Sequence, residues 1–587
     1  MSPPRTPPNL HQNTIDPEAK WLVQKFGGTS VGKFAVKIAD DIVSNYIDQH
    51  KVAIVCSARS GSTKALGTTN LLLRAAKEVL QRNNSPSGTP GHMTPTLFSS
   101  LAQAQSPTGS DSSRAQGASS PRESYTPGGF TPGGYVNLSL TSGRSPSFSS
   151  TVDVLRSEHL NAARASVRDP GLLRELELEI EQDCDGLRSF LFATQVIDEI
   201  SPRSRDSIIG FGERLACKVM TAILRDRGID AEYVSLENIV PVTEEELSDT
   251  ETLGQEFYDR VASAVAERIQ QCAPRVPVVT GFFGPVPGSL LRQVGRGYTD
   301  LLAALLAAGL GASELQIWKE VDGIFTADPR KVPTARLIPV ISPEEAAELT
   351  YYGSEVVHPF TMEQVIRRKI PIRIKNVENP QDGGTVIHPD PDVDVDVAPF
   401  GEDTIIPGNS TVYKPAAQKQ ERMLPTAVTI KERIIVLSVS SNRKSVSHGF
   451  LAGVFGTLDR YGVVVDLIST SEVYVSMAIE DSLDKRILDR VVRELQKNGT
   501  VTVSKNMAIL SLVGKRMRNM VGVAGLMFTT LGQGNVNIEM ISQGANEINI
   551  SCVIDARDAV KALNLIHQSC LQIKPEGARG RVGPWLF

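Results

Sequence analysis

Short hydrophobic runs and longer stretches of helical spacing alternate over residues 20–388. The runs with the length of buried strands are 21–23, 52–56, 276–282, 314–319 and 370–375. The stretches between them, including most of 151–270, carry apolar residues at helical intervals, which predicts helices. Strands that alternate with helices over this length predict an α/β fold, in which a parallel-rich sheet is layered with helices in one domain.

Four segments lack this alternation. More than half of the residues in 83–150 are Ser, Thr, Pro or Gly. Such a composition buries too little apolar surface to offset the entropy of ordering, so we predict a disordered insertion. Every proline in it follows Ser or Thr, which fits either a flexible linker or a cluster of proline-directed phosphorylation sites. We also predict a disordered tail at 1–19, an Asp- and Pro-rich linker at 389–427, and a tail at 576–587.

An internal repeat fills the C-terminal part of the chain. An offset of 73 residues aligns 436–439 with 509–512, and the same offset places Val475 on Ile548 without a gap. A register that holds over such a span indicates a duplicated unit.

Each copy of the repeat predicts β–α–β–β followed by a further helix, as in a ferredoxin-like βαββαβ unit. We place the two copies at 428–504 and 505–575. Tandem units with a Gly-rich strand–helix junction resemble the ACT module, a small-molecule sensor that usually binds amino acids. The alternative is a duplicated structural domain without a ligand.

Composition narrows the class of protein. The chain has 587 residues, of which 41% are hydrophobic and 22% charged, as expected for a globular protein of several domains. A net charge of −5 argues against a nucleic-acid partner. The six scattered cysteines form no CxxC or Cys/His cluster, so we predict reduced, buried thiols. The longest apolar run, 301–312, is too short to span a bilayer, so we expect no membrane partner and a cytoplasmic location.

Residues 25–30, Lys-Phe-Gly-Gly-Thr-Ser, carry the first candidate chemistry. The glycine pair lies between a predicted strand and a helical pattern over 31–42, so its backbone can approach a bound group at a helix start. Lys25 at the strand end can balance charge on a transferring phosphoryl group. The alternative is a tight strand–helix turn that happens to contain a lysine. Ser57 follows the next strand and can face the same ligand or lie in a plain surface loop.

Two further segments carry charged residues between glycines. Glu213 ends the string Ile209–Glu213, in which an aromatic is bounded by glycines. Arg296 lies between Gly295 and Gly297, and a guanidinium is the natural bidentate partner of a carboxylate. Thr299 or Asp300, just after it, suits the N-cap of a helix over 301–310.

In this order, the segments resemble the aspartate kinases of the amino acid kinase family, in a fungal-like, monofunctional form with tandem ACT domains. The strings KFGGTS, IGFGER and GRGYTD carry the resemblance, together with 318–330 and 351–359. It implies ATP-dependent phosphorylation of the β-carboxylate of L-aspartate, a first step toward threonine, methionine and homoserine, with ATP and Mg²⁺ as cofactors. The alternatives are another carboxylate kinase of the family and a catalytically inactive amino-acid sensor.

The resemblance also implies roles for single residues. Lys25 and Asp300 are expected at the reaction centre, with Asp300 either a proton acceptor or an organiser of Lys25. The acceptor carboxylate is already ionised at neutral pH, which favours an electrostatic role. The substrate-binding set is Thr29, Ser57, Glu213 and Arg296, in which Glu213 meets the α-amino group and Arg296 the carboxylate. The nucleotide-binding set is Gly27, Gly28, Ser30, Lys319, Glu320, Phe325 and Arg330.

Two positions depart from the bacterial pattern. Lys319-Glu320 stand where many bacterial relatives have Thr-Asp, and Glu355 stands where they often have a nucleotide-contacting lysine. His358, before Pro359, is either a phosphate donor or a structural cap of its loop.

The first copy of the repeat carries the candidate effector site: Gly449, Phe450, Val465, Asp466 and Ser471. Backbone N–H groups at Gly449 and Phe450 suit a carboxylate, Asp466 suits an ammonium group, and Ser471 suits a hydroxyl or an amide. Asp466 could also be a solvated strand-end carboxylate. The resemblance implies inhibition by an end-product amino acid, threonine first, and a homodimer or larger homo-oligomer formed through the ACT domains.

Overall fold

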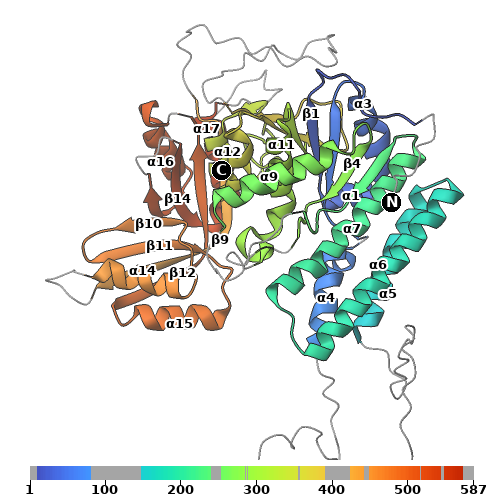
Figure 1. Cartoon of the computed structure of the whole chain (residues 1–587). Coiled ribbons are helices and arrows are strands. Elements are labelled where there is room, and N and C mark those ends of the chain that lie inside the picture. The colour runs from blue at the N-terminus through green and yellow to red at the C-terminus, as the bar shows by residue number, and fades with distance from the viewer. Residues whose placement is uncertain are drawn as a thin grey trace, which may run out of the picture. The chain divides into compact units, whose positions relative to one another are not determined.

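We describe the protein from a computed structural model. It describes residues 10–61, 63–80, 147–239, 253–284, 286, 289–354, 357–389, 424–441, 449–515, 517–543 and 548–572, all within one compact unit. The predicted phosphorylation sites, the Asp-rich part of the linker and residues 573–587 lie outside these ranges. The described strands form an eight-stranded sheet and a six-stranded sheet (Figure 1).

The eight-stranded sheet is parallel except for one antiparallel pair, β7–β8. Its order is β3-β4-β2-β1-β5-β7-β8-β6. The strands are β1 (Trp21–Phe26), β2 (Lys51–Cys56), β3 (Ala231–Val234), β4 (Val276–Thr280), β5 (Glu314–Lys319), β6 (Val340–Ile341), β7 (Ile372–Asn376) and β8 (Thr385–Ile387). Central strands are buried along nearly their whole length, because helices cover both faces. The predicted parallel-rich α/β layer is confirmed.

The helices of this part begin at identifiable caps. Ser201 accepts an N–H bond at the start of α7, Asp169 does so for α6, and Ser342 and Glu345 form a capping box at α12. The longer helices are α4 (Thr68–Leu80), α5 (Ser147–Ser166), α6 (Pro170–Ile197), α7 (Pro202–Asp226), α9 (Gln255–Gln270), α11 (Tyr298–Leu310), α12 (Pro343–Tyr351) and α13 (Pro359–Ile366). The shorter ones are α1 (Gly28–Lys33), α2 (Ala35–Lys37), the π-helical η1 (Ile38–Val43), α3 (Ser44–Tyr46), η2 (Lys64–Leu66), α10 (Leu290–Gln293) and η3 (Gly295–Gly297). Helices α4, α5, α6 and α7 pack side by side (Figure 1).

The structure corrects the two predicted disordered segments at their edges. Residues 10–19 were expected in the disordered tail, but Asn13 is buried and its side-chain amide bonds both the N–H and the carbonyl of Val52. Helix α5 begins at Ser147, inside the predicted insertion, because Phe148 is buried in the core. A polar composition cannot reveal a single anchoring side chain.

The six-stranded sheet has the order β10-β11-β9-β12-β14-β13. Its strands are β9 (Ala427–Ser441), β10 (Leu467–Thr470), β11 (Tyr474–Glu480), β12 (Gly499–Val513), β13 (Ile538–Ser542) and β14 (Asn549–Asp555). Its helices are α14 (Phe450–Arg460), α15 (Lys485–Leu495), η4 (Met517–Asn519), α16 (Val523–Gln533), η5 (Ala556–Asp558) and α17 (Ala559–Cys570). These elements follow the predicted βαββαβ order twice.

The two copies share their longest strands. Residues 436–441 of β9 pair with 499–504 of β12, which closes the first copy. The last strand of the second copy is residues 427–431, at the start of β9, which pair with 509–513. The copies are therefore interleaved. Strand β9 contributes its first residues to the second copy and its last residues to the first, so the expected boundary at 504/505 does not separate the two copies completely.

The offset between the copies changes within the repeat. Leu467 lies opposite Ala478 in the first copy, and Met540 lies opposite Val553 in the second. The offset is thus 73 before the hairpin turn (540 − 467) and 75 after it (553 − 478). The turn of the second copy is two residues longer, so the predicted gap-free alignment of Val475 with Ile548 is wrong beyond the turn.

Two expectations from composition can also be compared with the structure. All six cysteines are free and buried, as predicted. Among the described helices, none combines the length and the apolar character needed to cross a bilayer.

Candidate active site

Lys25 and Asp300 meet at the carboxyl end of the eight-stranded sheet. Lys25 is the penultimate residue of β1, and Asp300 lies in the first turn of α11. The Lys25 Nζ lies 2.6 Å from Asp300 Oδ1, and the two side chains are only 9% and 21% exposed. Burial strengthens the attraction between such charges and fixes their geometry. Sequence analysis named both residues, and the structure brings them together.

The glycine turn after β1 is held against the loop after β2. The Gly28 carbonyl accepts the N–H of Ser60 at 2.9 Å, and a Cβ on Gly28 would collide with the carbonyl oxygen of Ala58. Only glycine allows this approach. The helix after the turn is shorter than expected, because α1 has six residues and is interrupted at Phe34. Helical structure resumes at Ala35 and continues to Tyr46, so the expected helical stretch is present but broken at Phe34.

Ser30 lies beneath the surface of this site. It is fully buried, and its hydroxyl donates to Glu320 Oε1 at 2.8 Å. The hydroxyl therefore ties the glycine turn to the loop after β5. Direct contact of Ser30 with a nucleotide stays a prediction.

A cavity of about 560 Å³ lies beside these strand ends. Its lining residues are Ser57, Ala58, Thr69, Leu73, Ile200, Pro202, Arg205, Asp206, Ile209, Glu213, Ser289, Leu291, Tyr298 and Thr299. Ser57 and Glu213 were predicted to bind substrate. Arg205, Asp206 and Ser289 were missed by sequence analysis. Asp206 precedes Glu213 by seven residues, two turns of α7, so helical spacing places both on one face and could have revealed Asp206.

Glu213 is a buried carboxylate with donors from three directions. The Thr299 hydroxyl donates to Oε1 at 2.6 Å, the Phe282 N–H donates to Oε2 at 2.8 Å, and the Tyr298 hydroxyl lies close by. Burial raises the pKa of Glu213 to about 7, although these hydrogen bonds act in the opposite direction. Glu213 therefore joins α7 to the loop after β4 and to the start of α11.

The start of α11 differs from the expected cap. The helix begins at Tyr298, with Gly297 as its N-cap residue, so Thr299 and Asp300 both lie in its first turn. Neither caps the helix, because Thr299 bonds Glu213 and Asp300 pairs with Lys25. The side chain of Arg296 and all of Glu355 lie outside the described residues.

The predicted nucleotide segment follows β5. Lys319 ends the strand and Glu320 is exposed. Phe325 is half-buried, and its backbone forms an isolated antiparallel β-bridge with Leu337. The exposed guanidinium of Arg330 pairs with Asp328 through two contacts of 3.0 Å and lowers the pKa of that carboxyl. In this arrangement Arg330 would exchange Asp328 for a phosphate in order to bind a nucleotide.

His358 caps helix α13. Its Nδ1 accepts the N–H of Phe360 at 3.3 Å, directly after Pro359 at the first helical position. This contact supports the structural alternative for His358. Thr29 lies in α1 and is half-buried.

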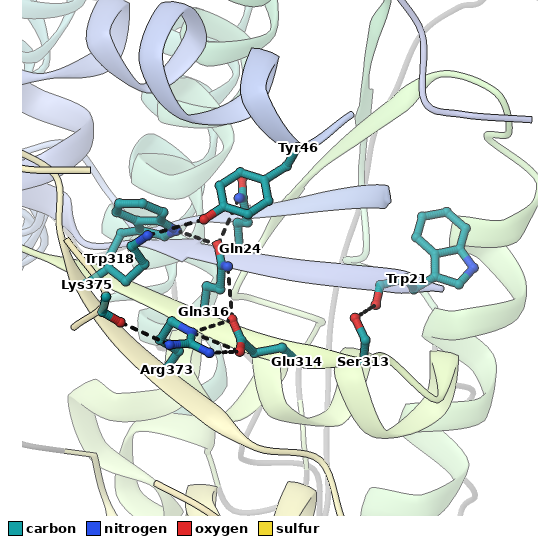
Figure 2. Close-up of polar contacts among 10 residues, drawn as sticks. Trp21, Gln24, Tyr46, Ser313, Glu314, Gln316, Trp318, Arg373 and Lys375 are labelled. Carbon is teal, nitrogen blue, oxygen red and sulfur yellow. Dashed lines mark hydrogen bonds and ion pairs between the residues drawn. The ribbon is translucent and has the colours of Figure 1, made fainter. Parts of the chain in front are cut away.

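A buried polar network crosses β1, β5 and β7 below the site (Figure 2). The Gln24 amide donates to Gln316 at 3.0 Å, and the Trp318 indole donates to the same oxygen at 3.2 Å. Glu314 accepts from Arg373 at 2.9 Å, and Lys375 lies 5.1 Å from the Trp318 ring. These contacts hold β5 against both neighbours and so fix the relative positions of the strand ends.

The predicted effector residues differ in their surroundings. Gly449 has φ +80° at the N-cap of α14, whereas the Phe450 side chain is buried in the core of the first copy. Asp466 Oδ1 accepts from Lys431 at 2.6 Å, and its buried Oδ2 has no hydrogen-bond partner among the described residues. Val465 is partly buried, and the N–H of Ser471 closes a turn on Tyr474. Lys431 was not foreseen, because it comes from the start of β9.

Comparison with known proteins gives consistent matches. Residues 20–376 match the amino acid kinase family, and residues 510–570 match an ACT domain. Aspartokinase of Schizosaccharomyces pombe is 47% identical over 581 residues, covering 97% of this chain and 98% of that protein. Aspartokinase of Saccharomyces cerevisiae is 44% identical, covering 94% and 93%. The fold is also that of E. coli aspartokinase III in complex with aspartate and ADP, with a TM-score of 0.62, 24% identity, and coverage of 94% and 99%.

The parallel-rich sheet and the strand-end site thus define an amino acid kinase followed by ACT modules. The chain belongs to the aspartokinases within the amino acid kinase family, because its fungal relatives match over nearly their whole length. The resemblance drawn from the sequence motifs is confirmed.

Proposed function

We propose that this chain transfers the γ-phosphoryl group of ATP to the β-carboxylate of L-aspartate. The observation that carries the proposal is the buried Lys25–Asp300 pair beside the cavity lined by Glu213, in a chain of the aspartokinases. Phosphoryl transfer needs alignment and charge neutralisation more than covalent chemistry. Lys25 and the Gly27-Gly28 backbone supply the first charge-stabilising groups for such a reaction.

The substrate contacts follow from the proposed site. Aspartate occupies the cavity with its ammonium near Glu213 and its carboxylate near Arg296, while Ser57 and Thr29 face its reacting end. ATP lies over Lys319, Glu320, Phe325 and Arg330. Mg²⁺ enters with the nucleotide, because it commonly binds through phosphate oxygens. We assign it no protein ligand.

An assay of ADP release over a panel of acidic amino acids tests the proposal. We expect turnover with aspartate alone. Turnover with glutamate or acetylglutamate would indicate another carboxylate kinase of the family, and aspartate binding without turnover with any of them would indicate an inactive sensor.

We further propose feedback inhibition through the ACT domains, because the nucleotide segment packs on the second copy. The Val428 N–H of β9 donates to the Thr326 carbonyl at 2.8 Å, and the Thr326 hydroxyl lies 2.9 Å from Nε2 of His567 on α17. Ala327 and Val332 are buried in the core formed with α16 and α17. A change in the ACT sheet therefore reaches the nucleotide segment through direct contacts.

Threonine is the proposed effector, bound at Asp466. We place the enzyme in the cytoplasm, as a homo-oligomer that supplies the synthesis of threonine, methionine and homoserine. Titration of threonine, lysine and methionine against wild type and Asp466→Ala tests the effector site. Asp466→Ala should weaken threonine inhibition while leaving uninhibited kcat unchanged. Equal inhibition of the two proteins would exclude Asp466 from the site.

A further inference from the structure

Arg205 lies on the cavity wall at the start of α7. Its side chain is exposed and lines the cavity, and the guanidinium, unlike the backbone N–H that bonds the Ser201 carbonyl, forms no hydrogen bond or ion pair with the other described residues. The positive charge of Arg205 acts on the neighbouring carboxylate of Asp206, but both oxygens of that carboxylate already accept hydrogen bonds from other residues. The guanidinium therefore has all its donors available to a molecule in the cavity.

Asp206 fixes this end of α7. It is buried, Oδ1 accepts from the Ser289 hydroxyl at 3.0 Å, and Oδ2 accepts from the Leu290 N–H at 2.7 Å. Ser289 has φ +109°, a conformation that costs energy for a residue with a side chain. The two bonds offset that cost and join α7 to the segment at 289–291, which also lines the cavity. Arg205 is thus attached to a rigid support.

The acidic residues around the cavity leave the donors of Arg205 unused, although its charge is felt by Asp206. Asp206 and Glu213 are the acidic lining residues, and both are satisfied by protein donors. Lys25 is balanced by Asp300. Arg205 is the one Lys or Arg among the lining residues that the structure describes. A guanidinium on a cavity wall whose donors are not bonded to the protein can hold an anion that accepts two parallel hydrogen bonds.

We propose that Arg205 binds a carboxylate of the acidic substrate at the cavity wall, in addition to the contact assigned to Arg296. The inference rests on the proposed function, in which this cavity receives aspartate. Arg205 would then set the affinity for a dicarboxylic amino acid and would leave the transfer step unchanged.

The test uses Arg205→Ala, Arg205→Lys and the control Arg203→Ala in the full chain. Arg203 lies in the same helical turn but does not line the cavity. We measure aspartate binding by calorimetry, steady-state constants for both substrates, and the salt dependence of KM for aspartate. A charge-assisted bond predicts that Arg205→Ala raises both Kd and KM for aspartate at least tenfold, with kcat and KM for ATP unchanged.

The remaining outcomes distinguish a failure of the role proposed for Arg205 from a failure of the proposed function. Arg205→Lys should fall between wild type and Arg205→Ala, because lysine keeps the charge without the planar fork. The salt dependence should weaken only in Arg205→Ala. Wild-type affinity in Arg205→Ala, or an equal loss in Arg203→Ala, would overturn the inference. If the wild-type chain binds no aspartate, the proposed function itself fails.

Discussion

At the scale of single residues, the site depends on charges that are paired and largely shielded from water. Lys25 and Asp300 come from different elements, and at their 2.6 Å contact the lysine side chain is 9% and the aspartate side chain 21% exposed. Glu213 is enclosed by Thr299, Phe282 and Tyr298. Each of these groups contributes to the packing of the site as well as to its proposed chemistry. Variants must therefore be compared both in stability and in activity.

Lys25→Met should lower kcat by about a hundredfold or more, because it removes the charge that stabilises the transferring group. It should also lower the thermal midpoint, because Asp300 is left buried without its partner. The double variant Lys25→Met/Asp300→Asn should recover the midpoint and remain inactive. Calorimetry and ADP release measure both quantities. Activity within tenfold of wild type in either variant would remove Lys25 from the reaction centre.

Titration of Glu213 should make the free energy of unfolding depend on pH between its unfolded and folded pKa values. Its pKa is about 7 in the folded protein against 4.5 for an ordinary glutamate, because burial disfavours its charge. Between these values the folded state binds more protons than the unfolded state, so stability falls as pH rises from about 4.5 to 7. Glu213→Gln should abolish that part of the slope when thermal midpoints are compared from pH 4.5 to 8. Parallel slopes for the two proteins would contradict the assignment.

At the scale of elements, the segment between β5 and β6 joins the proposed nucleotide contacts to the second ACT copy. Its Phe325 and Arg330 are proposed nucleotide contacts, whereas Thr326, Ala327 and Val332 lie against the second ACT copy. The proposed nucleotide contacts and the residues that pack on the ACT copy alternate within residues 325–332. We therefore expect a displacement of one group to displace the other.

Thr326→Val should weaken the proposed coupling, because it removes the hydroxyl that contacts His567 while keeping the side-chain shape. The variant also loses the bond that this hydroxyl accepts from the Arg336 N–H within the same loop, at 2.9 Å. Loss of one such bond, about 1 kcal/mol, corresponds to roughly fivefold. We expect the concentration of effector needed for half inhibition to rise by that factor, and KM for ATP to change while KM for aspartate stays constant. Thr334→Val is the control, since its contact with His567 is longer, at 3.4 Å. Equal effects of the two variants would argue against a specific route through Thr326.

At the scale of the whole molecule, the kinase part and the ACT copies are joined by direct contacts. Thr426 donates to Glu345 of α12, and Asn549 of β14 donates to Glu348 of the same helix. Because β9 contributes to both ACT copies, this strand joins the first copy to the second, which contacts α12.

Replacing residues 85–142 with a short Gly/Ser linker should leave kcat and both KM values close to wild type. Thr151 of α5 donates to Glu78 of α4 at 2.7 Å, so the helix ends flanking the insertion lie side by side and a short linker can join them. Shortening a loop changes its closure entropy only slowly. A deletion extended to residue 155 is the control and should yield insoluble protein, because it removes Phe148, Val152 and Leu155 from the core. An inactive first deletion would show that the insertion has an ordered role.

The sequence by itself determined the elements and the kinds of chemistry. Hydrophobic spacing located the main strands and helices, the strings around Lys25, Glu213 and Asp300 carried the family resemblance, and the repeat offset revealed the ACT modules. These features depend on neighbours within a few residues, where spacing translates directly into one face of a helix or strand.

Only the tertiary structure decided which of these residues meet. The pairing of Lys25 with Asp300 and of Asp466 with Lys431 depends on strand order, which local patterns do not specify. The interleaved copies follow from pairing between β9 and β12, and the two-residue shift of the repeat became visible only in the strand register. Arg205 lacks a distinctive motif, and its exposure to the cavity arises because Asp206 and Ser289 join distant segments. Contacts of this kind depend on the packing of the whole chain, and no sequence window contains them.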